Sequence, residues 1–307
     1  MTRRGVAAGV AVALSMQARP ASPAAGSEAK AQTTLYPSPD AYRVATGPVS
    51  AGRVAEVRES LSERDWAVIR DVARLRLVAG TQMERLHFAD LGEMSRSVVR
   101  RRVLGRLVKW RVLATLERRI GGERAGSSGL VYACDIAGKR LVGVSGRVTR
   151  PGTPGLLFVQ HVLAVSELYV ALVERTRRDQ QVRLENFEAE PACWWPDGQR
   201  GKLKPDAYVR LSTPTYHDHW WVEADRSTES LPTIRRKLGA YVSFWRSGQL
   251  GPGGIMPRVL LTVPDAKRYS EIVRLIRQLP TESQELVIVA VAKDAGAVLV
   301  RCLNQPD

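Results

Sequence analysis

The chain has 307 residues, of which 44% are hydrophobic and 25% are charged, and its formal net charge is +15. This length allows two ordinary domains with a sizeable core, and so strong a positive charge indicates a polyanionic partner, nucleic acid before an anionic membrane surface. The three cysteines, Cys134, Cys193 and Cys302, are far apart and show no CxxC spacing, which argues against a disulfide framework or a structural zinc site.

Residues 1–55 are rich in alanine and proline. Arg3 and Arg4 precede a short apolar run over 5–14, which imitates a signal peptide but is too short to span a membrane. Because the rest of the chain is basic and lacks a disulfide pattern, we favour a disordered tail on a cytoplasmic protein. A cleaved signal peptide is the alternative, and no later segment is expected to cross a membrane.

Residues 56–145 are predicted to form a helical domain that includes a β-hairpin. Ser62 and Asp65 have the spacing of a helix N-cap and its partner, and apolar residues follow at helical spacing. The next elements are a short helix, a basic third helix, and two strands joined by a Gly/Ser-rich loop, over residues 81–88, 95–110, 112–116 and 130–134.

The order of these elements resembles a winged helix-turn-helix. The third helix is basic over most of its surface and contains no acid. Such a helix fits the major groove, and the hairpin loop can reach the neighbouring DNA backbone. Alternatively, the arginines form a solvated face or bind a protein. The predicted DNA contacts are Arg96, Ser97, Arg100, Arg101, Arg102, Arg106, Lys109, Arg118, Arg119 and Arg124.

Residues 156–303 are predicted to form an α/β domain, with a mixed sheet flanked by helices. A linker over 145–155, rich in turn-forming residues, precedes it. The predicted order is α-β-β-β-α-β-α-β. The helices are expected at 157–177, 231–245 and 267–279, and the strands at 182–189, 204–210, 220–226, 258–263 and 285–291.

Three acids and a lysine gather in the middle of this domain. Asp206 lies on one predicted strand, Glu223 and Asp225 on the next, and Lys237 on the following helix. Residues i and i+2 of a strand share a face, so pairing of the two strands would bring the three carboxylates together. They would need a balancing charge, and Mg²⁺ prefers oxygen ligands. Alternatively, Asp206 caps a turn and the other two acids pair with nearby arginines.

These motifs resemble the PD-(D/E)XK nuclease-like superfamily and, more narrowly, the replication-relaxation family of plasmid proteins. The resemblance covers about residues 60–280. It implies a winged-helix domain before a nuclease-like domain, and a role in plasmid replication and DNA relaxation. The matching segments are 161–169, 204–207, 223–229 and 237–241.

The resemblance also implies roles for single residues. Asp206 and Glu223 match the two metal-binding acids, and Glu167 matches the auxiliary acid of the first helix. The superfamily has lysine where this chain has Asp225, and Lys237 could supply the missing positive charge. The expected catalytic set is therefore Glu167, Asp206, Glu223, Asp225 and Lys237. Asp206, Glu223 and Asp225 are the expected ligands of Mg²⁺ or Mn²⁺.

Two functions remain open from the sequence. One is a DNA-nicking enzyme, and the other is a non-catalytic DNA-binding initiator or regulator that keeps only the nuclease fold. In both, the expected partner is DNA, in particular plasmid DNA, and further partners are a second copy of the chain or other replication and mobilisation proteins.

Other patterns carry less functional weight. His217-Asp218-His219 is interpreted as a polar turn between strands rather than as metal ligands. The pairs Trp194-Trp195 and Trp220-Trp221 are interpreted as core residues, although such aromatics can stack on unpaired bases. The chain shows no Walker-type loop, Rossmann fingerprint or Ser-His-Asp order.

Overall fold

The computed structural model describes residues 47–116, 130–144, 146–152 and 154–304, which belong to one compact unit. The predicted DNA contacts Arg118, Arg119 and Arg124, and the predicted tail up to residue 46, lie outside the described residues. Residues 51–55, which the sequence analysis assigned to the tail, form the start of helix α1 (Ala51–Glu59).

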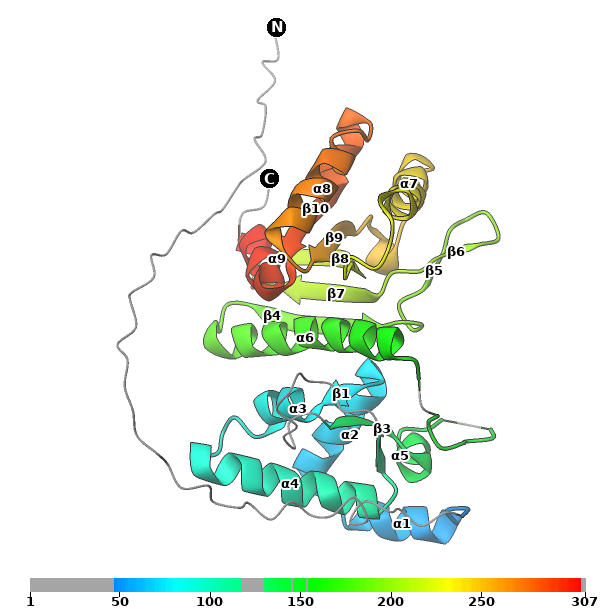
Figure 1. Ribbon diagram of the computed structural model, residues 1–307, viewed down its shortest axis with the longest axis vertical. Helices are drawn as coiled ribbons and strands as arrows, with labels where there is room; N and C mark the ends of the chain where they lie inside the picture. The colour runs from blue at the N-terminus through cyan, green and yellow to red at the C-terminus, as the bar shows by residue number, and fades with distance from the viewer. Residues whose placement is uncertain (1–46, 117–129, 145, 153, 305–307) are drawn as a thin grey trace, which may run out of the picture. The chain divides into compact units, whose positions relative to one another are not determined.

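The N-terminal part consists of helices around a small antiparallel sheet of strand order β1-β3-β2 (Figure 1). The predicted capping box is confirmed: the Ser62 hydroxyl accepts from the Asp65 N–H, and the Asp65 carboxylate accepts from the Ser62 N–H. After α1, the elements are α2 (Glu63–Leu75), β1 (Val78–Ala79), α3 (Gly80–His87), α4 (Glu93–Lys109), β2 (Leu113–Thr115), β3 (Val131–Cys134) and α5 (Ile136–Leu141).

The second part is α/β, and the predicted fold class is confirmed. The order of the predicted elements is observed, with the β5–β6 hairpin and α9 as additions that the sequence did not reveal. Three short 3-10 turns, η3 (Pro252–Gly254), η4 (Thr281–Leu286) and η5 (Ala292–Asp294), lie in its loops. Its helices and strands are α6 (Leu156–Arg178), β4 (Arg183–Ala189), β5 (Trp195–Pro196), β6 (Lys202–Leu203), β7 (Ala207–Ser212), β8 (His217–Ala224), α7 (Leu231–Arg246), β9 (Arg258–Val263), α8 (Ala266–Ile276), β10 (Val287–Val291) and α9 (Ala295–Asn304).

The main sheet of the described residues has the strand order β10-β9-β8-β7-β4. Strands β4, β7 and β8 pair antiparallel, while β8, β9 and β10 pair parallel. The interpretation of His217-Asp218-His219 as a turn is wrong, because all three residues belong to β8 and pair with β7. Asp218 forms an ion pair with Arg258 at 2.6 Å, and His219 Nδ1 lies 2.6 Å from the Tyr208 hydroxyl.

Helices cover both faces of this sheet (Figure 1). Successive side chains of a strand point to opposite faces, and on β8 Trp220 and Val222 enter the apolar cluster that includes α6 and α9. Trp221 enters the other cluster, with apolar residues of α7 and α8. Both tryptophans are fully buried, which agrees with their interpretation as core residues.

Helix α6 lies between the N-terminal helices and the sheet. The cluster that contains its Val165 and Leu172 also contains Ile69 of α2 and Val209 of β7. By length and composition α6 could cross a membrane, which the sequence analysis did not anticipate. Its packing on both sides is that of a core helix.

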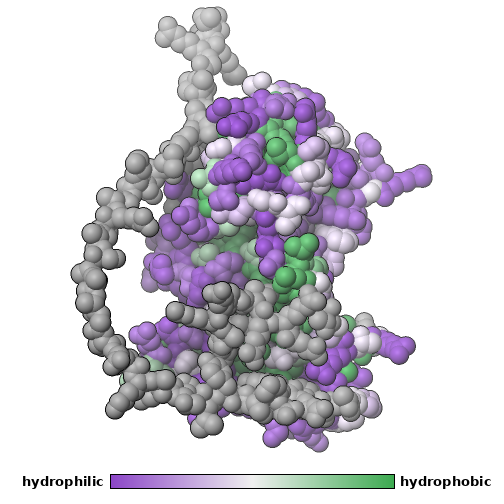
Figure 2. Space-filling model, in the orientation of Figure 1, coloured by the Kyte–Doolittle hydropathy of each residue, from purple (hydrophilic) through white to green (hydrophobic). Residues whose placement is uncertain are grey.

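The proposed division into two domains stays a prediction. The face of the molecule in Figure 2 is mainly hydrophilic, with smaller hydrophobic areas.

Candidate functional site

Strands β7 and β8 bring Asp206 and Glu223 together. Ala207 pairs with Val222, which places the preceding Asp206 across from Glu223. Asp206 is fixed at this point by two hydrogen bonds: its N–H donates to the Val222 carbonyl at 2.9 Å, and its Oδ2 accepts from the Ala224 N–H at 2.7 Å. Both carboxylates are buried.

Glu223 is a buried carboxylate with two partners on α7. The Tyr241 hydroxyl donates to Oε1 at 2.5 Å, and Lys237 Nζ lies 3.2 Å from Oε2. Burial raises the pKa of Glu223 to about 7, and the neighbouring Asp206 carboxylate adds to this effect, while Lys237 opposes it. The same burial, together with Glu223, raises the pKa of Tyr241 well above its ordinary value. Glu223 therefore sits where an additional positive charge would be favourable.

Lys237 joins this pair, as the sequence analysis expected. Its ammonium group bridges Glu223 and Glu229, at 3.2 and 2.9 Å. Burial acts to lower the pKa of Lys237, but the two carboxylates outweigh it and raise the pKa above its usual value. The lysine therefore stays charged, and because its side chain is 38% exposed, it can be reached from solvent.

His161, which is not among the site residues predicted from the sequence, completes the group. Its Nε2 lies 3.1 Å from Asp206 Oδ1, and the hydrogen bond to Asp206 raises the pKa of His161 against the effect of burial. The available signal was its place on the same predicted helix as Glu167, near the start of that helix. The family resemblance implies an acid on this helix, which points to Glu167 rather than to His161.

Glu167 and Asp225 have their contacts elsewhere. Glu167 binds Arg85 and Gln82 of α3, and Asp225 Oδ2 binds Arg268 of α8 at 2.6 Å. The structure thus brings Asp206, Glu223 and Lys237 together, whereas Glu167 connects α6 with α3 and Asp225 connects the end of β8 with α8.

Two carboxylates with an adjacent lysine have the chemistry of a site for a divalent cation that keeps part of its shell of other oxygen ligands. The described residues contain no group of three or more His, Cys, Asp or Glu side chains with metal-binding geometry. Mg²⁺, however, usually binds one or two carboxylates and keeps several waters or substrate phosphates. A cavity of about 10 Å³, about the size of one water, is lined by Glu223, Asp225 and Lys237 but not by Asp206. Asp206 and Glu223 are the residues that would hold the ion.

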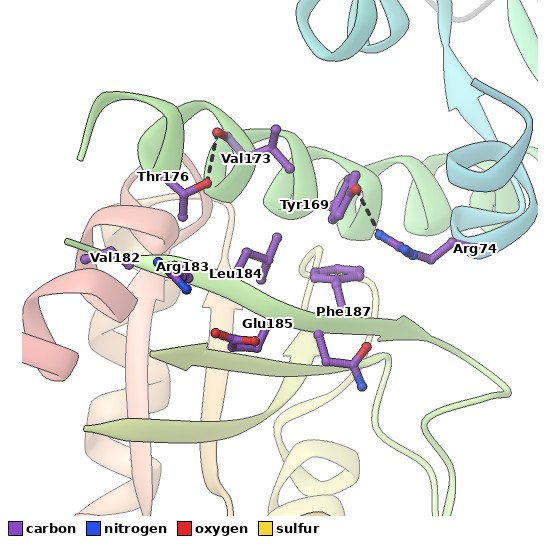
Figure 3. Close-up of a pocket in the computed structure, with 10 residues that line it drawn as sticks. Arg74, Tyr169, Val173, Thr176, Val182, Arg183, Leu184, Glu185 and Phe187 are labelled. Atoms are coloured by element: carbon purple, nitrogen blue, oxygen red, sulfur yellow. Dashed lines mark hydrogen bonds between the residues drawn. The ribbon is translucent and has the colours of Figure 1, made fainter. Parts of the chain in front are cut away.

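A larger cavity, of about 540 Å³, lies between α6 and the edge strand β4 (Figure 3). Figure 3 shows Arg74 of α2 reaching the Tyr169 hydroxyl on α6, to which it donates at 2.9 Å. Phe187 packs edge-on against Tyr169. The cavity is not lined by Asp206 or Glu223, so its size says nothing about the chemistry at the carboxylates.

Helix α4 exposes only part of its basic surface. Arg101, Arg102 and Lys109 are exposed. Arg100 is buried, with Glu84 at 3.0 Å, whereas Arg106 is exposed but binds the buried Asp65 at 2.7 Å.

The two remaining predicted contacts of α4 lie near its start. Arg96 donates to the Leu91 carbonyl at 3.1 Å, and Ser97 is half-buried. Of the predicted DNA contacts on α4, Arg101, Arg102 and Lys109 are exposed and form no ion pair with another described residue.

Residues 69–259 match the family model described as Replication-relaxation. The chain belongs to the replication-relaxation family. The match extends from α2 into β9, so the family region includes the basic face of α4 as well as Asp206, Glu223 and Lys237. Membership in this family indicates a role in plasmid replication or relaxation. No curated protein and no solved structure gives a significant match.

Proposed function

We propose that this replication-relaxation protein binds DNA and cuts one strand by metal-dependent hydrolysis at Asp206 and Glu223. One observation carries the proposal. The buried Glu223 carboxylate lies beside Asp206 and within 3.2 Å of Lys237, which is the charge arrangement that phosphodiester hydrolysis needs.

Each residue of the site has a distinct task in this reaction. Asp206 and Glu223 would hold a Mg²⁺ or Mn²⁺ ion, which would supply an activated water and offset the charge of the scissile phosphate. Lys237 stabilises the negative charge that develops on the phosphate. Tyr241 and His161 fix the orientations of Glu223 and Asp206 through the hydrogen bonds described above.

DNA binding is assigned to the N-terminal helices. Arg101, Arg102 and Lys109 form the exposed basic face of α4, and each phosphate contact would release counterions and make the affinity salt-dependent. The net charge of +15 favours the same partner. If the order of helices and hairpin strands acts as a winged helix, α4 is the element that enters the groove.

A second candidate is a DNA-binding initiator or regulator without catalytic activity. Asp225 replaces the lysine of the superfamily motif and is occupied by Arg268. Glu223 already has a positive partner in Lys237. In this alternative, the acid pair has no catalytic task.

Nicking of supercoiled plasmid DNA with Mg²⁺ or Mn²⁺ tests the proposal. Asp206→Asn keeps an acceptor for the Ala224 N–H but removes the charge, so it should abolish nicking while the variant still binds DNA. Lys237→Met should reduce nicking about 100-fold. Asp197→Asn is the matched control, because Asp197 accepts from backbone N–H groups in the exposed β5–β6 hairpin.

The outcomes separate the two candidates. Metal-dependent conversion to open circles that Asp206→Asn abolishes and Asp197→Asn retains supports the enzyme. A wild-type protein that shifts DNA on a gel without cutting it supports the non-catalytic candidate. Failure to bind DNA at low salt contradicts both.

A further inference from the structure

Arg76 occupies a backbone conformation that residues other than glycine avoid. It follows α2 directly, with φ 70° and ψ −49°. The Leu77 N–H donates to the Leu75 carbonyl at 2.8 Å, which closes a three-residue turn around Arg76. A turn of this hand is rare and strained, and strain of this kind concentrates where a side chain must be held in a particular place.

The Arg76 side chain contacts Glu190 and Phe158, which are neighbours of residues in the carboxylate site. Its Nη1 lies 3.0 Å from Glu190 Oε1, and its guanidinium lies 4.9 Å from the ring centre of Phe158. Glu190 is next to the site, because its N–H donates to the Asp206 carbonyl at 3.0 Å. Phe158 is one helical turn before His161 on α6.

The surroundings of Arg76 suit a phosphate ligand. The side chains of Arg76 and Glu190 are 38% and 23% exposed, so a ligand can reach the pair from solvent. Among the described residues, Arg76 donates to Glu190 through Nη1 alone, which leaves Nε and Nη2 for another acceptor. A guanidinium binds phosphate oxygens through a planar fork that lysine cannot reproduce.

We propose that Arg76 contacts a phosphate of the DNA strand lying at Asp206 and Glu223. The N-terminal helices then supply one residue to the site of the α/β part, and the site is incomplete without α2. The proposal rests on the proposed DNA-cutting function and adds the contact by which α2 positions the strand.

The test uses full-length Arg76→Gly, because glycine accepts a positive φ without strain. Arg70→Ala is the matched control, since it removes an exposed arginine from the same helix, where Arg70 lies over the Trp66 ring. Binding of a labelled DNA duplex is measured over a range of salt concentrations without divalent metal. The thermal unfolding temperature and plasmid nicking are measured in parallel.

Arg76→Gly should keep or raise the unfolding temperature. It should nevertheless reduce the slope of log affinity against log salt by about 0.9, the value for one phosphate contact, and slow nicking about 100-fold. Arg70→Ala should leave the slope and the nicking rate unchanged. A second variant, Arg76→Lys, should retain the slope because lysine keeps the positive charge. It should lose most of the nicking, because lysine lacks the planar guanidinium that binds two phosphate oxygens.

An Arg76→Gly protein with the wild-type salt slope would overturn the proposal, whether or not its unfolding temperature falls. This readout needs no cleavage, so it remains decisive if the wild-type protein binds DNA without nicking it. Absence of duplex binding by the wild-type protein would overturn the proposed function and this inference together.

Discussion

Glu223 is a carboxylate that the fold keeps from water. Its side chain depends on Tyr241 and Lys237 for partners, and burial beside Asp206 raises its pKa to about 7. The protein therefore binds a proton at this position more tightly when folded than when unfolded. A cation or a proton at Glu223 stabilises the folded state, whereas the bare carboxylate weakens it.

The raised pKa of Glu223 makes the stability of the protein depend on pH. Because the folded pKa lies above the ordinary value of 4.5, the contribution of Glu223 is fully present below 4.5 and is lost as the pH rises to about 7. The difference corresponds to roughly 3 kcal/mol. In metal-free buffer, Glu223→Gln should remove this loss and be more stable than wild type at alkaline pH, as measured by urea unfolding on both sides of the window.

Glu229→Gln is the control for that measurement. Glu229 is the other carboxylate partner of Lys237, and its side chain is 36% exposed, so its replacement should leave the pH profile close to that of wild type. Equal pH profiles for Glu223→Gln and wild type would show that the ionised Glu223 carboxylate does not lower the free energy of unfolding.

The contact between α3 and α6 depends on one arginine. Arg85 binds Glu174 through two nitrogens, at 2.9 and 2.6 Å, and also binds Glu167. Gln82 donates to the second oxygen of Glu167 at 3.0 Å. Arg85 also holds the pKa of Glu174 below its usual value. Glu167 thus belongs to the interface between α3 and α6.

Glu167→Gln therefore should lower stability slightly and leave nicking unchanged. An ion pair of this exposure contributes about 0.5–1 kcal/mol, so the fall in the free energy of unfolding should be of that size. Arg85→Gln breaks the ion pairs with both Glu167 and Glu174, so it should lower the free energy of unfolding by a larger amount. Loss of nicking in a fully stable Glu167→Gln protein would return Glu167 to the catalytic set.

The elements that local pattern determines were predicted well. The capping box of α2 depends on two residues three positions apart, and the predicted strand over 258–263 coincides with β9, because a strand of a parallel sheet reads as a continuous apolar run. The sequence predicts helix α4, but it does not reveal which of the helix's side chains are buried. Since arginines surround it, the sequence could not distinguish the buried Arg100 from the exposed Arg101.

The composition of the candidate site was harder to predict, because its partners are distant in the sequence. Asp206, Glu223 and Lys237 came together because strand pairing and the following helix are local consequences of the chain order. The partner of Asp225 is Arg268, and that of Glu167 is Arg85. Neither arginine belongs to a motif, so the pattern alone could not reveal that these acids are already paired.

One apolar cluster connects the N-terminal helices with the α/β part. It includes residues of α2, α6 and β7, such as Ile69, Tyr169 and Val209. Arg74 of α2 and Asp71 of the same helix both bind the Tyr169 hydroxyl, at 2.9 and 2.8 Å. Separating the two parts would expose this apolar surface to water.

The described residues should therefore unfold as one cooperative unit. In a urea titration followed by hydrogen exchange, α2 and β7 should lose protection at the same denaturant concentration. Tyr169→Ala should shift both midpoints together. Loss of protection in α2 at a clearly lower concentration than in β7 would show two independent domains instead.

Helix α6 is a rigid element that connects the carboxylate site at one end with α3 at the other. Its first turns carry His161, beside Asp206, and its last turn carries Arg177, which donates to the Arg85 and Leu86 carbonyls of α3. The helix between them measures about 24 Å at 1.5 Å per residue, which is the rise of about seven base pairs of DNA. Under the proposed function, this fixed separation between the carboxylates and α3, against which α4 is held by the Arg100–Glu84 ion pair, would keep the cut at a constant distance from the DNA contact.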